Sequence, residues 1–364
     1  MQFNKNKNLS KGWRKVKLGE IADINMGQSP HSEFYNSRGE GLPFYQGVTD
    51  FNEKYPKRSI YCSQPIKIAE AGDILFSVRA PVGDINVATE KSCIGRGVAA
   101  LRMKNRNNDF LYFLLKTYER HFRGVAGGTT YESINKDQIE NIELLVPKNP
   151  TEQKRIASIL SAFDDKIELN NKINQTLEEM AQVIFKEWFI KNQKAKIKKQ
   201  KLGDLVNITY GKGPASNELK KSGYPVYGAN GIIGYCDSYS CSDRQIIIGC
   251  RGVVGNITLT LPKCTITHNS LVLTPLNNRK IFLYYLLKNQ KLDAIAGGSA
   301  QPQITIRDLE NFELAIPDEK IQDKFESIVN IIEQKRLNNF YENQKLAEFR
   351  DLLLPKLMSG EVRV

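Results

Sequence analysis

The chain has 364 residues, 41% of them hydrophobic, and carries a formal net charge of +12 with a pI of about 9.2. This length predicts two or three domains, and the hydrophobic content is ample for their cores. No apolar run approaches the length of a membrane helix, which excludes a membrane-spanning protein. The positive charge is compatible with a polyanionic partner such as DNA, and equally with a soluble protein that happens to be basic.

The N-terminal segment and the cysteines indicate a cytoplasmic protein. No apolar segment of the secretory type follows Met1. The six cysteines form no C-x-x-C pair and only three histidines accompany them, so no zinc pattern emerges. We therefore expect buried thiols in a reducing compartment and no metal bound by this chain.

Residues 1–149 are predicted to form a first globular module. Short apolar runs alternate with Gly, Pro and Asn, and they include a buried strand at 74–78 and a short helix at 110–118. This mixture predicts the α+β class, with the functional variety in the loops. The loop residues that we expect to contact DNA are Gln28, Ser29, His31, Arg79, Arg96, Thr129, Thr130 and Tyr131.

Residues 150–192 are predicted to form one long helix. Asn149 can cap it, Pro150 suits the first helical position, and Glu152 fits the first turn. Apolar residues recur in alternating steps of about three and four residues, as in a coiled coil. The positions expected to pair with another helix or to dock a partner subunit are Leu160, Phe163, Ile167, Leu177, Ile184 and Trp188.

A lysine-rich linker over residues 193–201 follows the helix. Its lysines can contact phosphates, but a solvated linker is the more ordinary interpretation and the one we favour. The lysines in and beside this linker are Lys191, Lys194, Lys196, Lys198, Lys199 and Lys201.

The second module spans residues 193–317 with the linker included. Strands are predicted at 246–248 and 257–261, and a short helix at 282–287. The composition is again that of an α+β module with functional loops. The corresponding candidate DNA contacts are Lys212, Ser216, Asn217, Arg251, His268, Asn269, Ser299, Gln301 and Gln303.

Residues 318–364 are predicted to form a second long helix and a C-terminal tail. Asp318 is the expected cap, Pro355 is expected to interrupt the helix, and the Ser359-Gly360 pair to end it. The apolar steps match those of the first helix. The expected pairing or docking positions are Ile321, Phe325, Ile328, Ile332, Leu346, Phe349 and Leu353.

The two long helices are expected to pair with each other. A helix of ~40 residues measures ~60 Å, and so long an amphipathic stripe needs a partner. Antiparallel pairing would relate the modules by approximate two-fold symmetry. Polar residues in both stripes either fix the register or face solvent where the helices diverge: Asn170, Asn174, Lys335, Asn339 and Glu342.

The chain is an internal repeat. Residues 127–147 recur without a gap as residues 297–317, and residues 110–116 recur as 282–288. The unit is far longer than the ~20–50 residues of a solenoid repeat, so a whole module with its helix has been duplicated. The spacing between matched segments shrinks in Gly-rich stretches, which indicates two modules with a common scaffold and different loops. Such a pair suits a bipartite target.

The candidate loop residues have the chemistry of DNA contacts. Arg reads guanine and Asn or Gln reads adenine in the major groove, whereas Ser, Thr, Tyr and Lys suit phosphates. Arg79 and Arg251 are the strongest candidates, because the arginine recurs while its neighbours change. For any single loop residue a turn-stabilising or surface role is the more ordinary interpretation, and either arginine can instead form a structural ion pair.

Motifs for catalysis are missing from the sequence. The segment 317–320, Pro-Asp-Glu-Lys, is similar to a metal-dependent nuclease motif, but its place at a helix cap favours a structural role. There is no GxxxxGK[ST] phosphate loop and no Asn-Pro-Pro-Tyr run of an amino-methyltransferase. Any reaction that involves this chain is therefore expected to be carried out by a partner.

Two modules, two long helices and no catalytic motif resemble the specificity subunit of a type I restriction-modification system. The resemblance covers essentially the whole chain. It is carried by Leu-Gly-Glu-Ile at 18–21, Gly-Ser-Ala-Gln-Pro-Gln-Ile at 298–304, and the ending at 352–361. The first module departs from the pattern at 129–134, which lacks the glutamines of the second copy, so base contacts do not transfer from one module to the other.

The resemblance implies two target-recognition domains, each of which binds one half of an interrupted, asymmetric sequence in double-stranded DNA. The helices would set the spacer and dock two methyltransferase subunits, and restriction subunits would join the full complex. It implies no cofactor on this chain, with S-adenosylmethionine, ATP and Mg²⁺ in the partner subunits and methylation of a flipped adenine. The rival hypotheses are a coiled-coil scaffold for proteins alone and a self-sufficient methyltransferase or nuclease.

Overall fold

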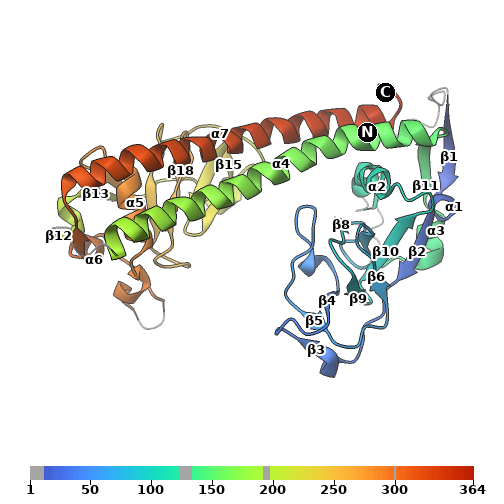
Figure 1. Cartoon of the computed structure of the whole chain (residues 1–364), viewed down its shortest axis with the longest axis horizontal. Helices are drawn as coiled ribbons and strands as arrows, with labels where there is room; N and C mark the ends of the chain where they lie inside the picture. The colour runs from blue at the N-terminus through green and yellow to red at the C-terminus, as the bar shows by residue number, and fades with distance from the viewer. Residues whose placement is uncertain (1–11, 123–132, 192–196, 299–300) are drawn as a thin grey trace. The chain divides into compact units, whose positions relative to one another are not determined.

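The computed structural model describes residues 12–122, 133–191, 197–298 and 301–364 (Figure 1). The chain divides into two compact units, which we call unit 1 (residues 1–168 and 343–364) and unit 2 (residues 169–342). This division runs through both long helices, whereas the sequence suggested boundaries at the helix ends. The reason is that each stretch of helix buries its apolar side chains on the module beside it.

Unit 1 is built around an antiparallel four-stranded sheet with the order β2-β10-β7-β8. A second sheet, β3-β5-β4-β9-β6, contains the parallel pair β4 and β9, and β1 pairs with β11. The strands are β1 (Trp13–Lys17), β2 (Ala22–Met26), β3 (Tyr35–Asn36), β4 (Leu42–Tyr45), β5 (Tyr61–Cys62), β6 (Ile68–Ala69), β7 (Ile74–Ser77), β8 (Ile85–Val87), β9 (Ser92–Ile94), β10 (Val98–Met103) and β11 (Glu143–Pro147).

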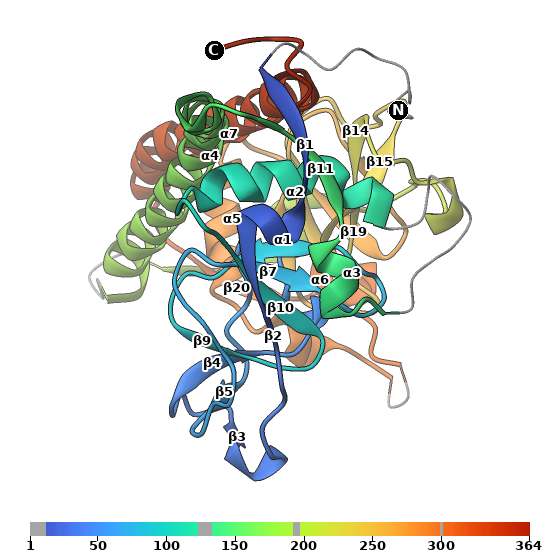
Figure 2. The same ribbon diagram turned by 90° about the vertical axis from the view of Figure 1, so that its right-hand side faces the viewer.

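Helices cover the four-stranded sheet of unit 1. The helices are α1 (Leu18–Ile21), α2 (Asn108–Phe122), α3 (Lys136–Glu140) and α4 (Pro150–Phe185), which continues into a π-helical turn at Lys186–Lys191. The long side of α2 lies across β7, β8 and β10 (Figure 2). Phe76 and Leu101 from the sheet, Phe113 from α2 and Leu160 from α4 share one buried core. The predicted strand at 74–78 and helix at 110–118 are confirmed.

Unit 2 repeats this arrangement with fewer strands. Its four-stranded sheet has the order β13-β19-β16-β17, β12 pairs with β20, and a three-stranded sheet has the order β15-β14-β18. The elements are β12 (Lys198–Lys201), β13 (Val206–Tyr210), β14 (Tyr224–Gly228), β15 (Gly231–Cys236), β16 (Ile246–Gly249), β17 (Ile257–Leu259), β18 (Thr265–Ile266), β19 (Ser270–Pro275), α5 (Lys280–Lys288), α6 (Ile306–Glu310), β20 (Glu313–Ile316) and α7 (Glu319–Met358).

The sequence repeat and the structural repeat agree. The four-stranded sheets share one strand order, and β4 and β9 of unit 1 correspond to the parallel pair β14 and β18 of unit 2. The second sheets differ, which is where the spacing between matched segments shrinks. The predicted strands at 246–248 and 257–261 and the helix at 282–287 are confirmed. The end of the lysine-rich linker, Lys198–Lys201, forms strand β12.

The expected caps are present on both long helices. The amide N–H of Thr151 donates to Oδ1 of Asn149 over 2.9 Å, and that of Lys320 donates to Oδ1 of Asp318 over 3.0 Å. The expectation for Pro355 is wrong, because α7 continues through it to Met358. A proline removes only one amide donor, and so near the helix end it interrupts little of the hydrogen-bond ladder.

Within each unit the two long helices pack against each other in opposite directions. In unit 1 the start of α4, at Leu160, shares a core with the end of α7, at Leu357 (Figure 1). In unit 2 the end of α4, at Phe185, shares a core with the start of α7, at Phe325. The α+β modules and the antiparallel helix pairing expected from the sequence are therefore confirmed.

Two of the positions that were expected to pair the helices or to dock a partner are exposed. Ile328 is 36% exposed and Phe349 is 56% exposed, so neither belongs to the buried face of α7. Val329 is buried next to Ile328, and the buried face also includes Gln322, Glu333 and Asn339. Polar residues also occupy the buried face of α7, so the apolar residues of the sequence pattern do not mark that face correctly.

The polar residues of the helix pair in unit 2 belong to its interior. Asn170 and Asn339 are each 1% exposed, so the alternative of solvent-facing positions fails for these two. The Asn170 amide donates to Oε2 of Glu342 over 2.9 Å, and the Asn339 amide donates to Oδ1 of Asn174 over 2.9 Å. These bonds join α4 to α7 and suit a role in fixing their register. Lys335 is exposed and lies outside this contact.

Candidate nucleic-acid interface

In unit 1 three loops meet at one end of the four-stranded sheet. Strand β10 runs antiparallel to both β2 and β7, so the C-terminal ends of those two strands lie beside its start. Backbone hydrogen bonds hold the loops there, from Gly27 N–H to the Val98 carbonyl and from Val78 N–H to the Gly97 carbonyl, both 2.9 Å. We call this place the reading end of the sheet.

The loop after β2 and the turn before β10 are tied together. The amide of Gln28 donates to the Ile94 carbonyl over 3.0 Å, and the amide of Arg96 donates to Oγ of Ser29 over 3.1 Å. Ser29 is thus half-buried and structural, whereas the side chains of Gln28 and Arg96 are exposed. The backbone is fixed and the two side chains point outward for contact.

Glycine permits this close packing of loops. A Cβ atom on Gly27 would meet the Gly95 carbonyl oxygen at 2.2 Å, and one on Gly97 would meet the Gln46 carbonyl oxygen at 2.1 Å. No other residue type fits without moving the backbone. The Gly-rich character noticed in the sequence therefore serves the approach of neighbouring loops.

Arg79 emerges at the same reading end. Val78, which precedes it, bonds Gly97 on one side and accepts from Ile134 N–H over 3.0 Å on the other. The Arg79 side chain is exposed and forms no ion pair with any residue in the described ranges, which disfavours a structural ion pair there. Thr129, Thr130 and Tyr131 lie outside the described residues.

Unit 2 builds a reading end with the same backbone bonds. Gly211 N–H donates to the Ser270 carbonyl over 3.0 Å, Cys250 N–H to the Asn269 carbonyl over 2.9 Å, and Ile304 N–H to the Cys250 carbonyl over 3.2 Å. The exposed side chains that these bonds bring together are Lys212, Arg251, His268 and Asn269. As in unit 1, Arg251 makes no ion pair among the described residues.

The remaining candidates are placed differently. Gln303 is half-buried in a backbone bridge with Gly297, with two hydrogen bonds of 2.9 Å, and Gln301 is exposed in the same loop. His31 and Asn217 are exposed but lie at short 3-10 helices, Ser32–Phe34 and Ser216–Glu218, farther along their loops. Ser299 and the side chain of Ser216 lie outside the described residues.

Two supporting residues were missed by the sequence reasoning. The Tyr35 hydroxyl donates to the Pro30 carbonyl over 2.7 Å, and its ring packs on Phe44 at 4.7 Å, which holds the loop of Gln28 and His31. Burial, with a smaller contribution from Cys62, raises the pKa of Tyr35, so the hydroxyl remains a donor. Asp50 Oδ2 accepts from Gln46 N–H over 2.6 Å beside Gly97. No regular spacing in the sequence relates Tyr35 or Asp50 to its partner, so these contacts could not be predicted.

The chemistry of both reading ends is that of recognition. Exposed Arg, His, Asn, Gln and Lys side chains can bond base edges and phosphates. Across the described ranges no group of three or more His, Cys, Asp or Glu side chains is arranged to hold a metal ion. No helix in those ranges combines the length and the apolar composition that a membrane crossing requires.

Known proteins resemble the chain in sequence and in fold. A family model described as the type I restriction modification DNA specificity domain matches residues 10–179 and again 194–347. The type I restriction enzyme MjaIX specificity subunit of Methanocaldococcus jannaschii is 26% identical over 415 residues, 98% of this chain and 95% of that protein. The putative MjaX specificity subunit of the same organism is 39% identical over 175 residues, which are 47% of this chain and 41% of that protein.

A solved structure shares the fold. The crystal structure of the S subunit of a type I restriction-modification system from M. genitalium matches with a TM-score of 0.65 and 22% identity. The match covers 98% of each chain. The whole architecture, with its two modules and its long helices, is therefore common to both proteins.

Proposed function

Since the chain belongs to the family of type I restriction-modification DNA specificity subunits, we propose that its two units read the two halves of one bipartite, asymmetric DNA sequence. One observation carries the proposal. The two reading ends have the same backbone hydrogen bonds but display different exposed side chains, Gln28, Arg79 and Arg96 in unit 1 against Lys212, Arg251, His268 and Asn269 in unit 2. A common frame with different donors suits two different half-sites.

We further propose that α4 and α7 dock two methyltransferase subunits and set the spacer between the half-sites. Both helices expose large apolar side chains, which a docked subunit would cover. Restriction subunits would join the full complex. The exposed apolar residues are Leu169, Met180 and Val183 on α4 and Ile328, Ile331, Phe349 and Leu352 on α7, with Ile331 73% exposed.

In this proposal the chain recognises DNA and its partners carry out the reaction. The methyltransferase subunits supply S-adenosylmethionine and the flipped-adenine pocket, and the restriction subunits supply ATP and Mg²⁺ chemistry. The exposed cations of the reading ends bind phosphates and base edges, which positions the target adenine for the partner. The complex acts on DNA in the cytoplasm.

A salt-dependent binding experiment tests the proposal. The purified chain, alone and with its methyltransferase, is mixed with genomic DNA fragments at ~50 to ~200 mM salt in gel-shift assays. Binding should weaken by orders of magnitude across this range, since each phosphate contact releases counterions. Labelled methyl transfer should require the methyltransferase. DNA binding that is absent at every salt concentration, or methyl transfer by the chain alone, would contradict the proposal.

A further inference from the structure

Each unit contains a buried carboxylate at the same position of its long helix. The register is set by two matching glutamines, since the Gln153 amide donates to the Pro147 carbonyl over 2.9 Å and the Gln322 amide to the Pro317 carbonyl over 2.8 Å. Asp164 on α4 follows Gln153 by the same number of residues as Glu333 on α7 follows Gln322. Their side chains are 5% and 1% exposed. Buried carboxylates need compensation by partners.

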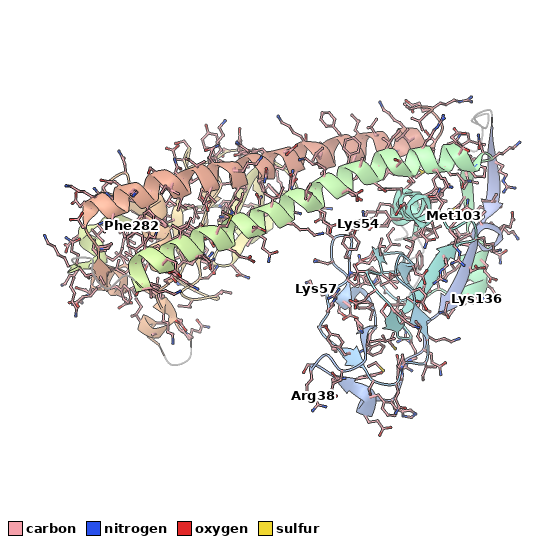
Figure 3. All side chains as sticks on the ribbon, in the orientation of Figure 1. Arg38, Lys54, Lys57, Met103, Lys136 and Phe282 are labelled. Atoms are coloured by element: carbon pink, nitrogen blue, oxygen red, sulfur yellow. The ribbon has the colours of Figure 1, made fainter. Side chains whose placement is uncertain are left out.

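In unit 1 the compensation comes partly from the recognition module. Lys54, which is labelled in Figure 3, has its Nζ atom 2.9 Å from Oδ2 of Asp164, and Arg350 of α7 lies 2.7 Å from Oδ1. The backbone carbonyl of Lys54 accepts from the amide of Val87 in β8 over 2.8 Å. Lys54 therefore connects the edge strand of the four-stranded sheet directly to α4. Its ammonium also lies 5.5 Å from the centre of the Tyr112 ring.

In unit 2 an arginine makes the same connection. Arg244 Nη2 lies 3.1 Å from Oε2 of Glu333, and Arg244 Nε donates to the Thr260 carbonyl over 2.9 Å. Thr260 directly follows β17, the edge strand that corresponds to β8. Glu333 also accepts from the Tyr285 hydroxyl over 2.9 Å and pairs with Arg336. The edge strand of this sheet is thus connected to α7.

The two connections come from different loops of the repeat. Lys54 lies between β4 and β5, whereas Arg244 lies two residues before the start of β16. The loops have diverged, yet both bring a cation to the same helix position and to the same edge strand. A contact rebuilt from different loop residues points to a requirement of the scaffold.

From this repetition we propose that Lys54 with Asp164 and Arg244 with Glu333 are positioning pairs. They fix each reading sheet on its stretch of long helix, and they thereby restrict the DNA spacer that the complex accepts. We call each pair a helix latch. The inference rests on the proposed function, in which the continuous helices carry the two reading ends.

The chemistry of the latches favours positioning over stability. Replacing a buried ion pair by well-packed apolar residues is often neutral or stabilising, so the ionic form contributes direction more than stability. Burial lowers the pKa of Lys54, but the charge and the hydrogen bond of Asp164, together with Tyr55 and Asp165, raise it above its ordinary value, so Lys54 keeps its charge at neutral pH. The attraction between the two groups, whose Nζ and Oδ2 atoms lie 2.9 Å apart, holds the loop of Lys54 against α4.

The test compares matched substitutions in the reconstituted methyltransferase complex. Lys54→Met keeps the stem over Tyr112 and removes the charge, Lys54→Arg keeps the charge, and Lys57→Met makes the same change at an exposed lysine of the same loop. Methylation is measured on a DNA library in which the spacer length varies by single base pairs. Thermal unfolding of each variant is measured in parallel.

The latch predicts a change in spacer preference, in addition to the stability that is lost when one partner of a buried ion pair is removed. Lys54→Met should keep both half-sites, but its selectivity for the native spacer should fall about tenfold against spacers one base pair longer or shorter, because the sheet is no longer held in one orientation. Lys54→Arg and Lys57→Met should match the wild type. A purely structural role would lower the melting temperature and total methylation without changing the spacer profile, and this result would overturn the proposal.

Unit 2 provides the second variant, in which the buried carboxylate keeps its other partners. In Arg244→Met, Glu333 keeps the Tyr285 hydroxyl and Arg336, so its charge remains paired. This variant should also broaden the spacer profile, while the exposed control Arg307→Met should not. If the wild-type complex accepts one spacer length and both latch variants show the same spacer profile, the proposed role of the latches is overturned and the proposed function stands. A wild-type complex without a fixed spacer would overturn the proposed function as well.

Discussion

Arg79 and Arg251 occupy the same place in the two units, and backbone hydrogen bonds hold the loops that carry them. Val78 and Cys250, the residues before them, each use both backbone groups to bond the neighbouring loops. Both guanidinium groups are left exposed, without an ion pair among the described residues. A fixed backbone with a free side chain is what base reading requires, because the loop is ordered before DNA arrives.

The first prediction concerns Arg79. Arg79→Ala should weaken binding to the cognate site by about 1–3 kcal/mol and relax specificity at positions in one half-site only. Arg14→Ala is the matched control, since it removes one positive charge from an exposed position on β1 of the same unit. Affinities are measured on the cognate duplex and on duplexes with single base changes. If both variants lose the same binding affinity on every duplex, Arg79 only attracts DNA without reading its sequence, which would contradict the prediction.

Among the helices and strands, those with a regular apolar pattern could be predicted from the sequence. The strand at 74–78 and the helix at 282–287 follow directly from apolar runs and their period. The pattern also placed Asn339 in the stripe of α7, where it is buried against Asn174. The burial of Glu333 does not follow from the pattern, because it depends on Arg244, which lies far away in the sequence. The same reasoning that finds amphipathic helices assigns such polar residues to the surface.

A second cluster on the helices of unit 2 makes stability depend on pH. Burial of Glu178 on α4 opposes its ionisation, but the hydrogen bond from Lys288 and the charge of Arg336 prevail and hold the pKa of Glu178 below its ordinary value of 4.5. A lowered folded-state pKa stabilises the fold above pH 4.5, and the stabilisation is lost as the pH falls through the lower value.

Glu178→Gln should therefore reduce the acid sensitivity of the protein. At pH 7 we expect it to lower the free energy of unfolding by about 2 kcal/mol, because two partly buried cations, Lys288 and Arg336, each lose one of their acceptors. The difference from wild type should shrink as the pH falls below 4.5. Unfolding of the whole chain between pH 7 and pH 3 measures this, with Glu179→Gln, an exposed neighbour, as control. A difference that stays constant over that range contradicts the assignment.

At the scale of the whole molecule, the repeat was visible in the sequence because scaffold segments such as 110–116 and 282–288 match closely. The reading ends followed only from the structure. Gly27, Val98 and Gly97 meet through backbone bonds that leave no pattern in the residue types.

The spacer should follow the length of the helices. We predict that four residues inserted into each long helix, after residue 168 and after residue 342, lengthen the spacer by about two base pairs, since four helical residues span ~6 Å and each base pair ~3.4 Å. Each unit keeps its own contacts, so both half-sites should remain unchanged. Four residues inserted after Arg38, in an exposed loop, should leave the spacer as it was. Altered half-sites in the helix variant would contradict the role of the helices in setting the spacer.

The most direct test of two different readers on one chain is a map of methylated adenines. The chain is expressed with its methyltransferase in a host that lacks other adenine methylation, and every modified adenine in the genome is located by sequencing. We predict one asymmetric sequence in two parts with a fixed spacer, and its loss when this chain is omitted. A single uninterrupted recognition sequence, or methylation that persists without the chain, would contradict the account.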